Sequence, residues 1–248
     1  MTDQRAIIRR LITVWETEDG RKKVDLRTDI DFQVSVVVRG LAAHAVDCAR
    51  GVLTLYEAGQ PVAAVPLIRA LLEDAVTAGW VLVVPEGWKA LVSEGSRTRA
   101  AVLDDAMRAN IGRVDERSEA RHREYAEHVN SLGRASGRYT KFQQRLAALD
   151  GTDDMYMLYR YLSSLSHASA ETVELYTAPN PQSQLQVSYR RHAAHPMAAN
   201  LLASASSSLL HALTAWDTTQ AGRPHQESLQ RAARELGVSS EWRLRTGS

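Results

Sequence analysis

Apolar residues recur every three to four positions along most of this chain, which is the spacing of amphipathic helices. In residues 31–58 this spacing continues for about eight turns, until Gly59 and Pro61 interrupt it. Residues 63–84 are apolar almost all round, and Pro85 ends the segment. The same periodicity predicts further helices over residues 3–17, 86–110, 114–132, 140–149, 153–169, 195–221 and 224–236.

Four of these segments are expected to form the core because their apolar periodicity is sustained. They are residues 31–58, 63–84, 153–169 and 195–221. Charged side chains are dense between positions 94 and 145, which predicts an outer, solvated layer. Gly112 and the pair Ser136 and Gly137 mark loops within that layer.

The segment 173–189 has the alternating pattern of strands instead. Apolar or β-branched residues alternate with polar ones at Val173, Leu175 and Thr177, and again at Leu185, Val187 and Tyr189. Residues 178–181, with two prolines and an asparagine, form a turn signal between the two runs. The pattern predicts a β-hairpin, with an extended loop as the alternative. The expected fold class is therefore all-α, a helical bundle with a small β-hairpin insertion.

The length of 248 residues predicts a single domain. It divides into an N-terminal helix and loop (1–30), the main helical core (31–221) and a C-terminal helix and tail (222–248). Hydrophobic residues make up 44% and charged residues 24%, which excludes a disordered tail. The 14 glycines and 7 prolines are too few for an all-β chain. The net charge of +1 argues against binding nucleic acid by overall charge alone.

Other features of the sequence exclude several classes of protein. The N-terminus carries Asp3 and several arginines, unlike a secretory signal, and the longest apolar run, 75–84, is too short to span a bilayer. We therefore expect a cytoplasmic protein with no membrane contact. The only cysteine, Cys48, lies on an apolar helical stripe and is interpreted as a core residue. The sequence has no phosphate-binding glycine loop, dinucleotide fingerprint or Cys/His zinc spacing, so it predicts no cofactor and no metal.

The main chemical signal lies in the helix predicted over 153–169. Arg160 and His167 are seven positions apart, so on a helix they fall within about 20° of one another. Arg160, Ser163, Ser164 and His167 form the polar sector of a helix that is otherwise apolar nearly all round. Such a helix is usually central, which predicts that this sector faces a cleft or another subunit. The alternatives are a solvated stripe, or an Arg and a His that hold a neighbouring loop.

A second group of charges interrupts the apolar segment 63–84. Arg69 and Glu73 are expected to pair with each other or with groups on other helices, because an isolated buried charge is costly. Arg before Glu at this spacing is the weaker order for a local pair, which favours partners on other helices, with Arg160 and His167 as candidates. His44 is expected to complete the cluster or to be a hydrogen-bonded core histidine.

At these residues the chain resembles the HEPN superfamily of helical proteins. The resemblance rests on the long helices, Arg69-x3-Glu73 in an apolar helix and Arg160-x6-His167 in a late helix, and covers residues 31–221. Active members carry an Arg and a His on one helix and cleave RNA without metal, often as toxins or phage-defence effectors. Tyr161 follows Arg160, where active members often have Asn, Asp or His.

The resemblance implies a metal-independent endoribonuclease that acts as a homodimer. His167 would transfer the proton and Arg160 would stabilise the charge that develops on the phosphate. Arg69, Glu73, Ser163, Ser164 and His44 would support them. The implied partners are RNA, a second copy of the chain and a cognate antitoxin or partner protein. The alternative is a non-catalytic helical module that binds a protein, a nucleotide or RNA.

Overall fold

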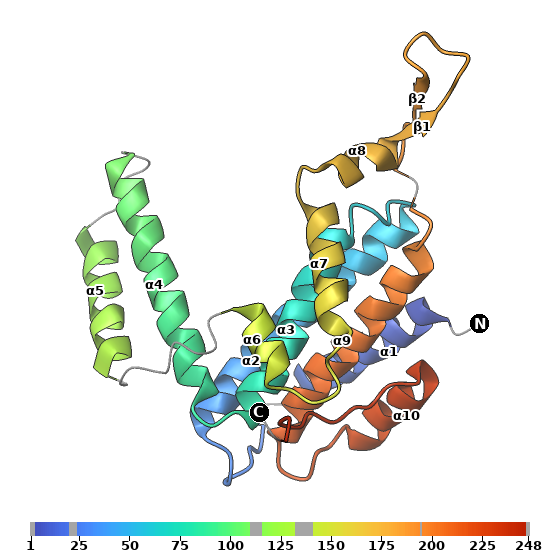
Figure 1. Ribbon diagram of the computed structural model, residues 1–248. Coiled ribbons are helices and arrows are strands. Elements are labelled where there is room, and N and C mark those ends of the chain that lie inside the picture. The colour runs from blue at the N-terminus through green and yellow to red at the C-terminus, as the bar shows by residue number, and fades with distance from the viewer. Residues whose placement is uncertain (1–2, 20–23, 110–115, 132–140, 194, 247–248) are drawn as a thin grey trace.

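The computed structural model describes residues 3–19, 24–109, 116–131, 141–193 and 195–246 (Figure 1). The chain is 69% helical, and its only sheet in these residues is a two-stranded antiparallel one. The expected all-α bundle with a small hairpin is confirmed. The loops expected at Gly112 and at Ser136 and Gly137 lie outside the described residues.

Three long helices form the centre of the bundle: α2 (Phe32–Glu57), α3 (Val65–Val83) and α9 (Ala198–Thr218). The side chain of Asp31 caps α2 by accepting a hydrogen bond from the backbone N–H of Gln33 (2.9 Å). Pro66 is the second residue of α3, within the first turn, where its missing N–H leaves no helical bond unmade. Small side chains let these helices pack closely. Buried examples are Ala42, Ala45, Ala49, Ala75, Ala78, Ala205 and Ala212.

The two terminal helices close one side of this centre. α1 (Gln4–Asp19) packs on α9 and buries Ile7, Ile8 and Leu11. α10 (Gln226–Leu236) also packs on α9, and Gly237 ends it in the left-handed conformation (φ 69°) that glycine adopts at low cost. The first and last helices therefore also contribute to the core, which the sequence did not predict.

The helix that carries the predicted motif, α7 (Met155–Ser166), lies on the surface of α3 and is not central. Only Leu162 and Leu165 of this helix are buried, whereas Met157 is 70% exposed. The expectation of a central helix is therefore wrong. Tyr156, Tyr159 and Tyr161 contribute to the apolar pattern of this helix, but each is only half-buried, because a tyrosine can pack with its hydroxyl toward water. The helix also ends at Ser166, three residues earlier than expected.

The β-hairpin exists, but it is shorter than predicted. Val173 and Leu175 lie in α8 (Ala170–Tyr176), which corrects the expected first strand. Ser169 caps α8 by accepting a hydrogen bond from the backbone N–H of Thr172 (3.2 Å), and this cap outweighs the strand preference of an isolated valine. β1 (Thr177–Pro179) then pairs antiparallel with β2 (Val187–Tyr189), with Thr177 opposite Tyr189.

The charged middle of the chain forms an arm. α4 (Gly87–Arg108) and α5 (Glu116–Ser131) lie side by side and project from the bundle (Figure 1). Trp88 anchors the base of α4, where its indole N–H donates to Asp31 (3.1 Å). The outer, solvated position expected for this segment is confirmed.

The chain beyond α10 crosses back over the bundle. Trp242 lies directly on Gly79 of α3, and its indole N–H donates to the carbonyl of His211 (3.1 Å). Farther on, Leu244 pairs with Leu149, just after the short helix α6 (Phe142–Ala147). Among the described residues, no helix combines the length and the apolar character needed to cross a membrane.

Candidate functional site

Arg69 on α3 and His167 at the end of α7 are in direct contact. One guanidinium nitrogen of Arg69 lies 3.2 Å from Nε2 of His167. Because an arginine only donates, Nε2 accepts this bond, which assigns the imidazole proton to Nδ1 and makes the ring neutral in this arrangement. The expected partnership of Arg69 with His167 is confirmed.

Two further side chains, Glu73 and Tyr159, hold the Arg69 guanidinium in place. Its second terminal nitrogen lies 3.1 Å from the carboxylate of Glu73 and donates to the hydroxyl of Tyr159 (3.1 Å). The guanidinium carbon also lies 5.1 Å from the centre of the Tyr159 ring, within cation–π range. Burial lowers the pKa of Arg69, but Tyr159 and Glu73 raise it by more, so the side chain stays cationic.

Arg69 has a partner on its own helix and another on a different helix. It pairs with Glu73 on α3, in spite of the weaker order of their charges, and it contacts His167 at the end of α7 as well. Tyr159, one of the aromatic residues in the apolar pattern of its helix, belongs to this site. Phe142 packs against its ring, with the ring centres 4.4 Å apart. The rigid aromatic contact fixes the position of the hydroxyl that Arg69 meets.

His167 is exposed, and its ring is turned toward a side chain rather than toward a backbone carbonyl. It caps the C-terminal end of α7 in an extended conformation. Its carbonyl oxygen accepts a hydrogen bond from the hydroxyl of Thr172 (2.8 Å), which ties it to α8. The backbone of His167 is therefore held between α7 and α8, while its imidazole remains open to solvent.

The other residues of the predicted motif do not join this contact. Arg160 is exposed and has no hydrogen-bond or ion-pair partner in the part of the chain that the structure describes. The hydroxyls of Ser163 and Ser164 donate to the carbonyls of Tyr159 and Tyr161 on their own helix. The arginine that meets His167 is thus Arg69 from α3. Sequence spacing along one helix could not reveal a partner on another helix.

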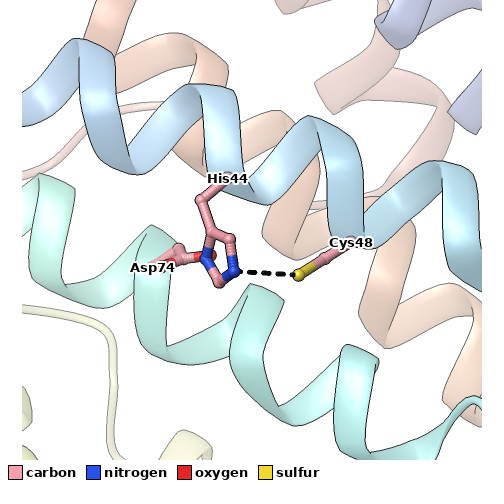
Figure 2. Close-up of side chains that lie close together, drawn as sticks. All are labelled: His44, Cys48 and Asp74. Carbon is pink, nitrogen blue, oxygen red and sulfur yellow. Dashed lines mark hydrogen bonds and ion pairs between the residues drawn. The ribbon is translucent and has the colours of Figure 1, made fainter. Parts of the chain in front are cut away.

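A second polar cluster lies on the facing surfaces of α2 and α3 (Figure 2). Nδ1 of His44 lies 2.7 Å from a carboxylate oxygen of Asp74, and its Nε2 lies 3.8 Å from the sulfur of Cys48. His44 therefore pairs with Asp74, while the nearby Asp47 pairs with Arg50 (3.0 Å). His44 is not in contact with the Arg69 site, so its expected place in that cluster is not found.

The environment of this second cluster disfavours charge on both buried groups. Burial raises the pKa of Asp74 to about 7, although His44 acts in the opposite direction. Burial also raises the pKa of the Cys48 thiol to about 11, and the negative charges of Asp74 and Asp47 add to this effect. The order Asp74, His44, Cys48 is that of a cysteine-hydrolase triad, but a buried thiol with a raised pKa is a poor nucleophile.

Sequence comparison places the chain in a family. The family model of DUF5677, a family of unknown function, matches residues 35–184, and the chain belongs to this family. The matched region contains both polar clusters and the whole of α7. No curated protein and no solved structure matches the chain.

Proposed function

We propose that this protein is a HEPN-like, metal-independent endoribonuclease in which His167 transfers the proton. The observation that carries the proposal is the contact between the exposed imidazole of His167 and the guanidinium of Arg69. Cleavage of RNA needs a proton-transfer group beside a cation, because the nucleophile is the 2′-hydroxyl of the substrate itself. The two side chains meet both requirements.

The chemistry assigned to each residue follows from its contacts. When a phosphate of the RNA binds to Arg69, it replaces His167 as the acceptor of the guanidinium hydrogen bond. Nε2 of His167 is then free to accept the proton of the 2′-hydroxyl. The 2′-oxygen then attacks phosphorus, the bond to the 5′-oxygen breaks, and this oxygen takes up a proton from solvent. The products are a 2′,3′-cyclic phosphate and a 5′-hydroxyl. Arg69 stabilises the negative charge on the phosphorus oxygens with its planar set of donors.

The remaining residues have supporting roles in this proposal. Glu73 and Tyr159 keep the Arg69 guanidinium oriented through the two 3.1 Å contacts. Arg160 is free to bind a neighbouring phosphate of the RNA, because it is exposed and unpaired among the described residues. Ser163 and Ser164 present hydroxyl oxygens beside the motif, but their protons are committed to the helix.

The surroundings of the His167 ring bear on the non-catalytic alternative. If His167 only held neighbouring parts of the chain together, its imidazole would be buried against a backbone carbonyl, whereas the ring is exposed and contacts Arg69.

The open face of α7 offers a surface for a second copy of the chain. Met157 is exposed and lies three residues before Arg160, so the two are neighbours on this face. Val173 and Tyr176 of α8 add further exposed apolar surface. A second copy of the chain that covers Met157 would bring two Arg160 side chains close together.

The experiment that tests this function is incubation of cellular RNA with the purified protein in excess chelator. We expect fragments that end in a 2′,3′-cyclic phosphate. An oligonucleotide with 2′-deoxyribose throughout is the matched control and should remain intact, because it lacks the nucleophile. Cleavage of the deoxy control, or cleavage that needs added divalent metal, would contradict the proposed chemistry.

A further inference from the structure

A small pocket lies where the end of α8 and the chain after β2 meet the loop between α2 and α3. Its volume is about 210 Å³. Four side chains able to contact a ligand line it together with small residues of the loop, and these are Gln60, Tyr176, Arg191 and His192. The backbone N–H of Arg190 donates to the carbonyl of Tyr176 (2.7 Å), which holds the two segments side by side.

We propose that this pocket holds one nucleotide of the substrate RNA, a few nucleotides away from the bond that is cut. The proposal rests on the ribonuclease function proposed above and names a binding subsite for the same substrate. Proteins that bind single-stranded nucleic acid combine positive charge for the phosphates with aromatic rings on which bases stack. The pocket offers both.

Each of the four side chains suits one part of a nucleotide. Arg191 is exposed and has no partner among the described residues, so its planar set of donors is available for a phosphate. His192 adds a ring N–H beside it. Tyr176 is 42% exposed, which leaves part of its ring open to a base. The amide of Gln60 can donate to and accept from the edge of that base.

The local charge favours an anion. Among the residues that the structure describes, no acidic side chain lines the pocket, although Glu171 and Glu174 lie on α8. Glu57, near the end of α2, pairs with Arg9 of α1. The nearest carboxylates therefore leave Arg191 free to meet a phosphate.

The size of the pocket limits the ligand to a small unit. Pockets that hold drug-sized molecules measure about 300–1,000 Å³, and this one is smaller. A single nucleotide with its neighbours outside is a suitable occupant, whereas a folded RNA element is not. The strand on either side of this nucleotide remains free to continue along the surface.

Two segments connect the pocket to the proposed cleavage site. α8 has seven residues, a length of about 10 Å, and runs from Thr172, which contacts the His167 carbonyl, to Tyr176 in the pocket (Figure 1). Along α3, Ala63 of the pocket precedes Arg69 by six positions, or roughly 9 Å. At about 3.4 Å per stacked nucleotide, a strand of roughly three nucleotides covers this distance.

The test measures binding without cleavage. The probe is a short, fluorescently labelled single-stranded RNA in which every 2′-hydroxyl is methylated, so that it lacks the nucleophile, and binding is followed by anisotropy. Tyr176→Ala should weaken binding by about 5–150-fold, the usual effect of losing one stacked base. Tyr176→Phe keeps the ring and should bind like the wild type. Wild-type affinity in Tyr176→Ala, or no binding of the probe by the wild-type protein, would overturn the proposal.

A matched pair of arginine variants separates the pocket from simple charge attraction. Arg191→Ala should weaken binding by about tenfold or more, because it removes a charged hydrogen-bond donor. Arg190→Ala removes the same charge one position away, at a residue that does not line the pocket, and should weaken binding far less. Equal weakening by both variants would overturn the proposal. Circular dichroism of each variant confirms that it is folded.

The two proposals fail in different ways. If the wild-type protein cleaves RNA but all the pocket variants bind the probe equally well, the pocket proposal is wrong and the ribonuclease proposal stands. If the probe binds through Tyr176 and Arg191 but RNA is never cleaved, the ribonuclease proposal is wrong and the pocket binds RNA for another purpose.

Discussion

Arg69 donates a hydrogen bond to Nε2 of His167 across 3.2 Å, although 98 residues separate them along the chain. The bond joins α3 of the central bundle to the end of α7 on its surface. It fixes an exposed imidazole beside a guanidinium that Glu73 and Tyr159 already orient. This arrangement differs from the one that the Arg160-x6-His167 spacing suggested, because the cation in contact with the histidine comes from another helix.

Replacement of Arg69 should therefore impair RNA cleavage strongly. Arg69→Ala should slow cleavage by about 10²–10³-fold, the usual effect of losing one preorganised donor to a developing anion. Arg69→Lys should recover only part of the rate, because an ammonium lacks the planar set of donors. The control is Arg231→Ala, an exposed arginine on α10, which should cleave at the wild-type rate. Wild-type cleavage by Arg69→Ala would remove Arg69 from the proposed site.

The contact between Trp242 and Gly79 predicts a large effect from a small substitution. In Gly79→Ala the new Cβ would lie 2.2 Å from the indole ring, so the ring must move. Overpacking of this kind typically costs about 1–3 kcal/mol of unfolding free energy. Chemical denaturation should show that loss, and tryptophan fluorescence should report the displaced ring.

Gly40→Ala is the matched control for this substitution. Gly40 lies inside α2, and a Cβ there meets nothing within 4 Å. Alanine is favoured over glycine in a helix by roughly 0.5–1 kcal/mol, so this variant should be slightly more stable than the wild type. Similar destabilisation in both variants would contradict the structural account of Trp242.

The buried His211 predicts a loss of stability in mild acid. Burial lowers its pKa below the ordinary value of 6.5, and hydrogen bonds with the backbone of Ser239 and Ser207 only partly oppose this. As the pH falls below about 6.5, His211 takes up a proton in the unfolded chain but stays neutral in the folded protein. The free energy of unfolding therefore decreases by up to about 1.4 kcal/mol per pH unit. Above about pH 6.5 the side chain is neutral in both states, so His211 no longer makes the free energy of unfolding depend on pH.

Unfolding free energies measured at several pH values between 5 and 8 would check this prediction. His211→Gln should flatten the pH dependence, even if it is less stable at every pH. His128→Gln, at an exposed histidine on α5, should keep the wild-type slope. An unchanged slope in His211→Gln would show that other groups cause the acid sensitivity.

The exposed surface of α7 predicts that the protein is a homodimer. Light scattering at micromolar concentration should give twice the mass of one chain. Met157→Glu places a charge on the 70% exposed apolar side chain next to Arg160 and should yield monomers. Val102→Glu, at an exposed position on α4, is the control and should remain dimeric. A monomeric wild-type protein would contradict the prediction.

Much of the fold could be predicted from apolar periodicity alone. The helix boundaries agree with the structure to within a few residues, because Pro61, Pro85 and the glycines mark the ends of the long segments. The errors arise where one residue type suits two environments. The tyrosines of α7 add to an apolar pattern but are only half-buried, and Val173 fits a strand pattern although Ser169 caps a helix there.

The candidate sites were only partly predictable, for a physical reason. Arg69, Glu73 and His167 stand out because polar side chains interrupt apolar segments, but the spacing of one helix cannot show which helices meet. Tyr159 and Asp74 contact the sites across a helix–helix interface, and the sequence around them gives no sign of this contact.

The most direct test of the account is the rate of RNA cleavage by His167→Ala relative to the wild type, both in excess chelator. Loss of the proton-transfer group should lower the rate by about 10²–10⁴-fold. The thermal unfolding midpoint should stay close to that of the wild type, because the side chain is exposed. If the wild-type protein is inert and His167→Ala simply melts at a lower temperature, His167 has a structural role and the ribonuclease proposal is wrong.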